Sequence, residues 1–190
     1  ALPISERERA KQQLEAERET LDRLLERIEE LLNDITEALV RASERGEIER
    51  LVTERFGGGD EYATAWLARY DDTSKEVSVT EWAGRDRVVE PSLSLEGDQP
   101  AGLAALRAAI EGGEVRRVDD TEGLPTPPTD DTCLLLPLTY RSVTYGVLAV
   151  FSDTGGVSER ERVLLGVLAR CIGTSINDVL TKQSLATDTV

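Results

Sequence analysis

An apolar stretch with a polar break in its middle, residues 132–153, constrains the fold of this chain more than any other feature. Residues 133–138 are too short for an ordinary helix, and Pro137 is not compatible with a helix interior. Residues 145–151 are rich in β-branched and aromatic side chains. The polar residues 141–144 between the two runs predict a β-hairpin. Because neither run alternates with polar residues, we expect both strands to be covered on both faces, in the middle of a sheet.

A long helix is predicted at the start of the chain, because residues 5–44 contain neither glycine nor proline. It would span about 60 Å. Apolar residues at coiled-coil spacing form a seam along this helix. The seam is polar at its upstream end, at Lys11 and Arg18, and a second apolar stripe widens it downstream. We expect a helix that pairs with a second copy and also meets the sheet, the alternative being a single core helix. The coiled-coil spacing that supports pairing is formed by Leu21, Leu25, Ile28, Leu32, Ile35 and Leu39.

The remaining elements follow from turn signals and periodicity. We predict a helix at 47–56, a hairpin of strands at 60–70 and 75–82, a helix at 98–110 and an edge strand at 115–118. The alternation in 60–70 places Tyr62 and Trp66 on one face. A capping box of Ser158 and Glu161 starts the last helix. Its small residues allow the close approach of another helix or, in the alternative, of the sheet itself; they are Gly166, Ala169 and Gly173. Its buried stripe is expected at Leu165, Leu168, Ile172, Ile176 and Val179.

The end of the chain resembles a known family. The motifs that carry the resemblance are Leu136-Pro137-Leu138, the Gly-Val-Leu run of residues 145–150 and the acidic helix start at 158–161. They resemble the closing half of a GAF domain, and the whole ending resembles the GAF modules of haloarchaeal transcription regulators of the bacterio-opsin activator type. The resemblance implies an α+β fold with a central antiparallel sheet of five to six strands, helices on both faces and a long N-terminal coiled-coil helix. We expect a signalling and dimerisation helix at 1–45, the GAF domain at 46–184 and a disordered tail at 185–190.

The composition limits the partners and the location of the chain. Acidic residues outnumber basic ones by 37 to 22, for a formal charge of −15. Such a surface argues against direct binding of nucleic acid or an anionic membrane, and it fits a protein kept dissolved in high salt. No segment is expected to span a membrane or to act as a signal peptide. With two cysteines and no methionine, we expect a cytoplasmic fragment of a longer protein.

Few residues of this chain could carry chemistry. The absence of histidine excludes histidine-based metal sites and the usual catalytic triads. The acidic pairs, such as Asp130-Asp131, lack calcium-loop spacing, so no metal site is predicted. GAF domains that bind cyclic nucleotides resemble one another in an Asn-Lys pair. This chain has Phe151-Ser152-Asp153 at the corresponding place, so we do not expect it to bind a cyclic nucleotide. The candidate pocket residues are Tyr62, Trp66, Trp82, Leu103, Cys133 and Leu135, and no cofactor is assigned. The alternative for Trp66 and Trp82 is that they are core aromatics on buried strand faces.

We therefore expect a non-catalytic sensory GAF module of a regulator that contacts DNA only through a domain outside this chain. It would bind an unknown small molecule, form a homodimer, or do both. Leu168 and Ile172 of the last helix would join the first helix in the dimer interface. Two alternatives remain: a thiol-dependent enzyme that resembles methionine sulfoxide reductases and uses Cys133, and a dimerisation spacer without a ligand. The acidic neighbours of Cys133 favour an inert thiol over a reactive one.

Overall fold

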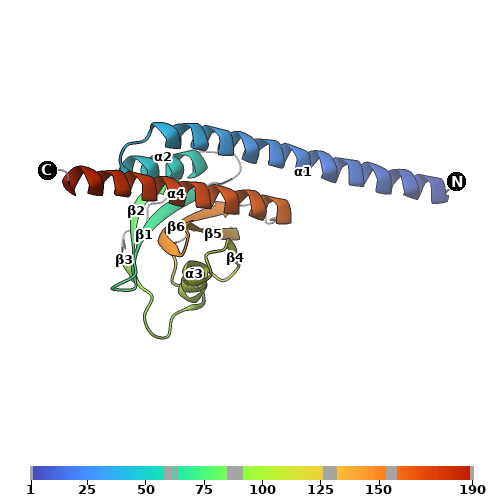
Figure 1. Ribbon diagram of the computed structural model, residues 1–190. Coiled ribbons are helices and arrows are strands. Elements are labelled where there is room, and N and C mark those ends of the chain that lie inside the picture. Colours follow the sequence, from blue (N-terminus) through green and yellow to red (C-terminus); the bar gives the residue numbers. More distant parts are fainter. Residues whose placement is uncertain are drawn as a thin grey trace.

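The computed structural model describes residues 2–57, 62, 64–84, 92–125, 132–152 and 158–188. Within these residues the chain forms an α+β fold, as predicted (Figure 1). The helices are α1 (Leu2–Arg41), α2 (Arg45–Gly57), α3 (Ala101–Gly112) and α4 (Glu159–Asp188). The strands are β1 (Thr64–Asp71), β2 (Glu76–Ala83), β3 (Ser92–Ser94), β4 (Arg116–Val118), β5 (Thr132–Tyr140) and β6 (Val143–Ser152).

The six strands form one antiparallel sheet in the order β3-β2-β1-β6-β5-β4. The predicted hairpin is confirmed as β5 and β6, and β6 lies between β5 and β1 in the middle of the sheet. The chain reverses at Arg141, whose φ of 55° is the left-handed conformation that such tight turns require. Strand β4 is at an edge, as predicted, whereas the short edge strand β3 was not predicted.

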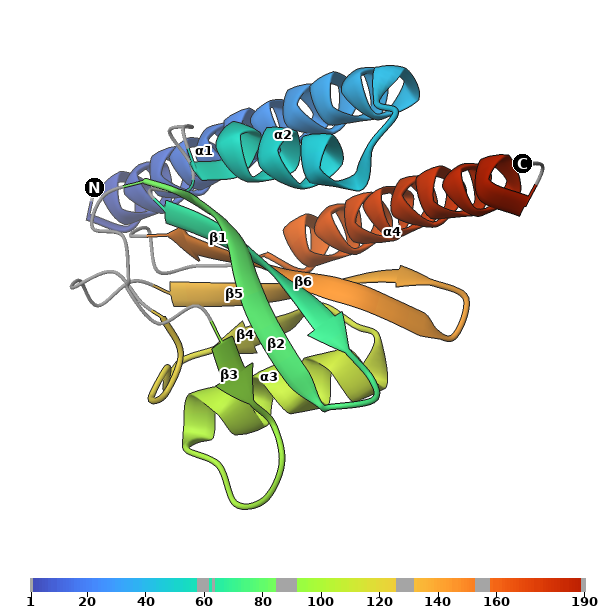
Figure 2. The same cartoon turned by 90° about the vertical axis from the view of Figure 1, so that its left-hand side faces the viewer.

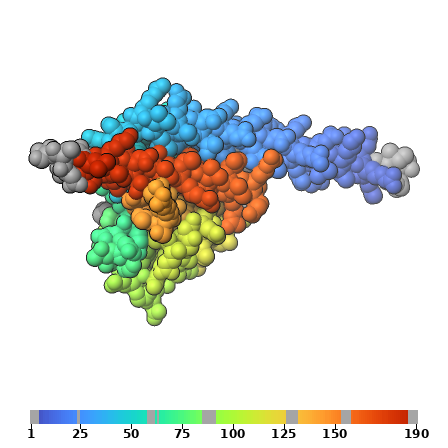
Figure 3. Space-filling view, viewed as in Figure 1, coloured from blue at the N-terminus to red at the C-terminus, as the bar shows by residue number. Residues whose placement is uncertain are grey.

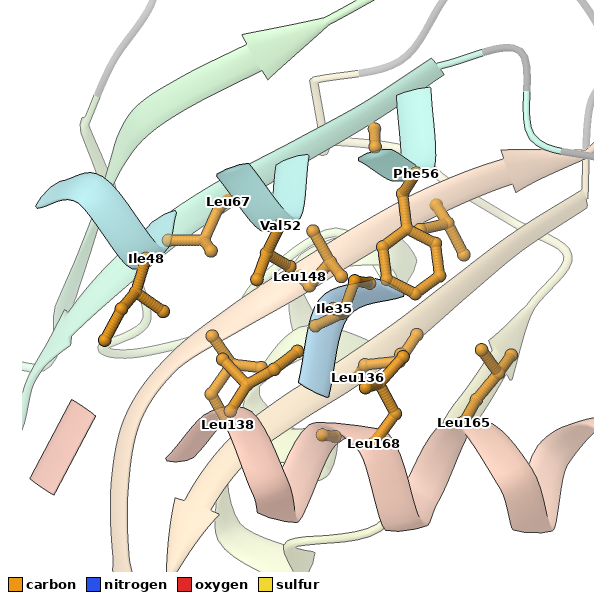
Figure 4. Close-up of a cluster of buried hydrophobic side chains, with 14 of the residues drawn as sticks. Ile35, Ile48, Val52, Phe56, Leu67, Leu136, Leu138, Leu148, Leu165 and Leu168 are labelled. Carbon is orange, nitrogen blue, oxygen red and sulfur yellow. The ribbon is translucent and has the colours of Figure 1, made fainter. Parts of the chain in front are cut away.

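Helices cover both faces of the sheet, and each face has its own buried cluster (Figure 2). Helices α2 and α4 pack on one face, and the second half of α1 lies over them as an outer layer. Side chains from Ile35 of α1 to Leu168 of α4 meet there over Leu136 and Leu148 of the hairpin (Figure 4). Among the described residues, helix α3 covers the opposite face, together with Leu95 before it and Leu124 after it. This arrangement explains why β5 and β6 are apolar without alternation: both of their faces are buried.

Helix α4 lies very close to the sheet, because one of its glycines contacts a strand. A Cβ added at Gly173 would overlap the backbone of Thr139 in β5. The side of α4 that faces the sheet is buried as expected. Its residues are Leu165, Leu168, Ile172, Ile176 and Val179. At Gly173 the close approach is therefore to β5, which agrees with the alternative that the small residues bring this helix close to the sheet.

Two further expectations differ from the structure. Tyr62 belongs to the cluster under α2 and α4, whereas Trp66 belongs to the cluster under α3, so the two do not share a face. The reason is that β1 begins only at Thr64, and the alternation of a strand does not extend to a residue before it. Helix α4 continues to Asp188, so residues 185–188 are helical where a disordered tail was expected. The pair Asp130-Asp131 lies outside the described residues.

The expectation that no segment is apolar enough to span a membrane needs a correction. Among the described residues, the helical segment 159–185 passes a test of length and composition for a membrane span, with a mean hydropathy of 1.5 over its best window. Its apolar character has a structural reason, since Leu165, Leu168 and Ile172 are fully buried against the sheet. A core helix passes the same test, so we assign this segment to the core of the domain.

Candidate functional site

Five of the six candidate pocket residues lie on the face that α3 covers. Trp82 of β2 is paired with Trp66 of β1, Trp66 with Ala149 of β6, and Ala149 with Leu135 of β5. Residues paired in this way project from the same face, so these side chains form a row across four strands. Leu103 of α3 and Cys133, two residues before Leu135, belong to the same buried cluster. The structure thus gathers all of these candidates except Tyr62.

The two indoles of this row differ in their hydrogen bonding. Trp66 is fully buried, and its Nε1 donates to the carbonyl oxygen of Pro125 at 2.8 Å. Trp82 is half-buried at the end of the row, with its Nε1 atom out of contact with solvent. That Nε1 has no hydrogen-bond acceptor among the residues that the structure describes. A buried donor without an acceptor lowers stability, so the Trp82 end of the row is a place where a ligand acceptor would be favoured.

Cys133 has the environment of an inert thiol. Its side chain is fully buried under α3, beside Phe151, its pairing partner on β6. Burial raises the pKa of the Cys133 thiol to about 12, because the apolar surroundings penalise the charged thiolate. The thiolate is the nucleophilic form of cysteine. Cys133 is therefore neutral and inaccessible at ordinary pH. The second cysteine, Cys171 of α4, is half-buried on the other side of the domain.

Three open hollows of the described surface lie away from the indole row. A groove of about 510 Å³ runs between the end of α1 and α4, with Val40, Val167 and Cys171 in its walls. A second hollow of about 430 Å³ separates α4 from the β4 edge. A third, of about 280 Å³, lies at the far end of α3, between Tyr70 and Arg107. None of the six candidate pocket residues lines any of these three hollows.

The residues predicted for a dimer interface are mostly inside the protomer. Ile35, Leu168 and Ile172 are fully buried in the cluster under α2 and α4. Ile28 is 1% exposed and Leu25 8% exposed, so little of either remains for a partner in this conformation. Leu32 is half-buried, and Leu21 keeps 38% of its surface. The apolar seam of α1 is thus largely covered by the chain itself. The homodimer remains a prediction, and its interface would have to form from residues that are exposed in the protomer.

A buried polar cluster was not predicted from the sequence. Glu49 of α2 is 1% exposed and accepts hydrogen bonds from Arg69 of β1. Arg45, at the start of α2, lies 3.3 Å from the same carboxylate and donates to the carbonyl oxygen of Tyr145 at 2.9 Å. The hydrogen bonds that Arg69 donates to Glu49 raise the pKa of Arg69, so this guanidinium stays charged. In the sequence, Glu49 cannot be distinguished from the exposed acidic residues of a helix. Its burial and its pairing with Arg69 depend on the packing of β1 against α2.

Metal chemistry finds little support in the described residues. No group of three or more histidine, cysteine, aspartate or glutamate side chains comes together there in a way that could hold a metal ion. Nor do the described side chains define a cofactor. Among the described residues, the α3 face offers the indole N–H of Trp82 as a hydrogen-bond donor to a ligand, and the Cys133 thiol on the same face is buried and neutral.

Comparison with known proteins connects this chain to haloarchaeal regulators. The bacterioopsin transcriptional activator of Halobacterium salinarum is 44% identical over 189 residues, which is 100% of this chain and 28% of that protein. A putative transcriptional regulator of Haloferax volcanii is 28% identical over 182 residues, covering 90% of this chain and 29% of that protein. The chain therefore spans less than a third of the length of either relative.

Solved structures share the fold at low sequence identity. The GAF domain of a phosphoenolpyruvate-protein phosphotransferase from Coxiella burnetii has a TM-score of 0.66 at 18% identity and covers 83% of this chain and 96% of its own. The free methionine-R-sulfoxide reductase from Neisseria meningitidis, solved with its substrate, has a TM-score of 0.66 at 15% identity, covering 82% and 91%. The sequence pattern of the GAF domain family matches residues 65–178, so the chain belongs to the GAF domain family.

Proposed function

We propose that this chain is a non-catalytic sensory module of a transcription-regulating protein. It binds a small molecule against the α3 face of the sheet and pairs with a second copy of itself. The named relatives support the regulatory context, since one is a transcriptional activator and the other a putative transcriptional regulator. DNA contact would come from another part of such a regulator, because the charge of −15 disfavours contact by this segment. A regulator of this kind would work in the cytoplasm, with residues 1–45 carrying signals between its parts.

The observation that carries the ligand proposal is the buried Nε1 of Trp82, which lacks an acceptor among the described residues. A ligand with a carbonyl or carboxylate oxygen would satisfy it. The Trp66 indole beside it would supply an apolar wall, although its own N–H is already bonded to Pro125. Such a ligand would be largely apolar, with at least one hydrogen-bond acceptor.

The enzyme alternative has less support. Some neighbours in fold are methionine sulfoxide reductases by name. In this chain, however, Cys133 is buried and its thiol pKa is raised to about 12, so it offers no nucleophile. A thiol-specific reagent should label Cys133 only as fast as the protein unfolds. Rapid labelling of Cys133 in the folded protein would reopen the enzyme alternative.

Thermal unfolding of matched tryptophan variants tests the ligand proposal. Trp82→Phe keeps an aromatic ring, removes the unsatisfied N–H and makes the half-buried side chain smaller, so we expect a smaller loss of stability without ligand than in Trp66→Phe. Trp66→Phe strands the carbonyl of Pro125 and should cost about 1–3 kcal/mol. A molecule retained in native mass spectrometry should raise the melting temperature of the wild type, and its affinity should fall about tenfold in Trp82→Phe.

Two outcomes would count against the proposal. If nucleotides, organic acids, amino acids, flavins and apolar acids all leave the melting temperature unchanged, the spacer alternative gains. If a ligand binds but Trp82→Phe binds it as tightly as the wild type does, the site is not at the Trp82 end of the row. Either result leaves the pairing of two copies to be tested separately.

A further inference from the structure

The solvent-facing side of α4 is a narrow stripe with regular spacing. Between residues 161 and 181 the exposed positions are Val163, Val167, Arg170, Thr174, Asp178 and Thr181, and Leu185 continues the stripe one turn later. Successive members are separated by four, three, four, four, three and four residues, which keeps all of them on one side of the helix. This side is opposite to the stripe that packs on the sheet. Figure 3 shows α4 on the open face of the molecule.

The spacing of this stripe is symmetric about Thr174. Reading from Thr174 in either direction gives steps of four, three and four residues. An antiparallel copy of α4 would therefore place matching positions opposite each other, with Thr174 at the two-fold axis. Arg170 would face Asp178 of the second copy, and the apolar ends of the stripe would face each other over about 33 Å of helix. These ends are Val163, 57% exposed, and Leu185, 62% exposed.

Charge selects this antiparallel arrangement. Within the part of the chain that the structure describes, neither Arg170 nor Asp178 has an ion-pair partner. The two are eight residues apart, about 12 Å along the helix, so they cannot pair with each other in one copy. An antiparallel pair of helices would bring together two Arg170–Asp178 pairs across the interface. A parallel pair in register would instead place like charges opposite each other, which is unfavourable.

The middle of the stripe is shaped for close contact between two helices. The Thr174 hydroxyl donates to the carbonyl oxygen of Arg170 at 2.8 Å, so its polar atom is already satisfied at the proposed axis. Cys171 and Ser175 on either side are small and half-buried. They line the groove of about 510 Å³ between α4 and the end of α1, where Val40 is 83% exposed. A second α4 in this groove would cover Val40 together with Val167, which a lone protomer leaves in water.

We propose that two copies of this chain associate through an antiparallel, two-fold symmetric contact between their α4 helices, centred on Thr174. This inference rests on the homodimer in the proposed function and specifies its geometry. In one protomer α1 and α4 lie side by side and run in the same direction (Figure 1). An antiparallel α4 contact therefore directs the N-terminal halves of the two α1 helices away from each other, so they do not form a coiled coil together.

A charge exchange tests the contact directly. We expect Arg170→Glu and Asp178→Arg each to raise the dissociation constant of the dimer at least about tenfold, measured by analytical ultracentrifugation in the salt at which the domain is folded. The double variant should return to within about threefold of the wild type, because both cross-pairs are restored with exchanged signs. Arg116→Glu is the matched control, since it makes the same change of charge at the exposed β4 edge. A double variant as weak as the single ones would overturn the proposal.

Engineered cysteines test the direction of the helices. In a Cys171→Ser background, Val163→Cys and Leu185→Cys proteins should form a disulfide-linked heterodimer when mixed, and Val163→Cys alone should not cross-link. Cross-linking of Val163→Cys with itself would show a parallel contact and overturn this inference while leaving the homodimer intact. A wild-type protein that remains monomeric would overturn both. Neither result bears on the ligand, whose test depends on Trp82.

Discussion

Glu49 of α2 and Arg69 of β1 form a buried ion pair, in which Nε of Arg69 lies 2.9 Å from both carboxylate oxygens. The Glu49 side chain is 1% exposed, whereas 44% of the Arg69 side chain remains in water. Arg45 approaches the same carboxylate from the start of α2, and it also donates to the carbonyl oxygen of Tyr145. Two cations therefore share one buried anion. The cluster fixes α2, and with it the connection from α1, to strands β1 and β6.

Glu49→Gln should destabilise the domain more than any substitution at a surface pair. The change removes the charge, keeps the shape and leaves the partly buried Arg45 without its anion. We expect a loss of about 2–4 kcal/mol in the free energy of unfolding, at the lower end if Arg69 turns into solvent. Glu37→Gln is the control, because it breaks an exposed pair with Arg41 that contributes about 0.5 kcal/mol or less. If a denaturant titration gave equal losses for Glu49→Gln and Glu37→Gln, the buried cluster would contribute no more to stability than the exposed pair does.

Stability should fall at high pH because of Cys133. The unfolded chain loses the thiol proton near about pH 8.5, whereas burial raises the pKa of Cys133 in the folded chain to about 12. Between these values the unfolded state binds fewer protons than the folded state. The free energy of unfolding therefore decreases as pH rises, by up to about 1.4 kcal/mol per pH unit from this group. Cys133→Val removes the titration, so its stability should decrease less steeply between about pH 9 and 11. Parallel slopes would contradict the raised pKa.

The sheet and its layers could be predicted because local signals agree with the fold. The run through Pro137 excludes a helix, and the unbroken apolar character of β5 and β6 reports burial on both faces. Ser158 does cap α4, with its Oγ accepting from the backbone N–H of Glu161 at 3.1 Å. The Glu161 side chain accepts instead from the Tyr62 hydroxyl at 2.6 Å, so only half of the predicted capping box forms. Sequence spacing shows that the box is possible, but not that a distant tyrosine competes for it.

The role of α1 was harder to predict for a geometric reason. The heptad period of 3.5 residues and the helical period of 3.6 differ too little, over the five turns from Leu21 to Leu39, to tell a partner helix from the domain itself. The structure covers Ile28 and Ile35 with the same chain. The stripe of α4 cannot be recognised in the sequence for a related reason. Arg170, Thr174 and Asp178 are polar, and they form a pattern only once the buried side of α4 is known.

Tyr145→Phe should loosen the second half of α4. The Tyr145 hydroxyl of β6 donates to Oδ1 of Asn177 at 2.6 Å, in a partly buried contact. Removing the hydroxyl should cost about 1 kcal/mol and increase hydrogen exchange in α4 around Asn177, with little change in α3. Tyr70→Phe serves as the control, since the contact of its hydroxyl with Asp72, at 3.4 Å, is exposed to solvent. Unchanged exchange in α4 would mean that packing alone holds this half of the helix.

Two glycines of α4 should respond in opposite ways to the same change. At Gly173 an added methyl group would overlap the backbone of Thr139, which cannot move without distorting β5. Gly173→Ala should therefore cost about 2 kcal/mol or more. At Gly166 the nearest atom to an added Cβ is Cγ2 of Val115 at 3.7 Å, which is ordinary contact. Gly166→Ala should gain up to about 1 kcal/mol from helix propensity.

The contact between Gly173 and Thr139 also bears on how ligand binding at the sheet could be transmitted to α4. Small residues in α4 suggest a helix that slides, but the contact of Gly173 with Thr139 holds it at one point of β5. A ligand on the α3 face would then act by tilting α4 about Gly173, and not by shifting it along its axis. Spin labels at Arg160 and Lys182, near the two ends of α4, should report opposite displacements relative to a label on α3 when ligand binds. Displacements of equal sign and size would indicate sliding, and Gly173→Ala would then be tolerated as well as Gly166→Ala is.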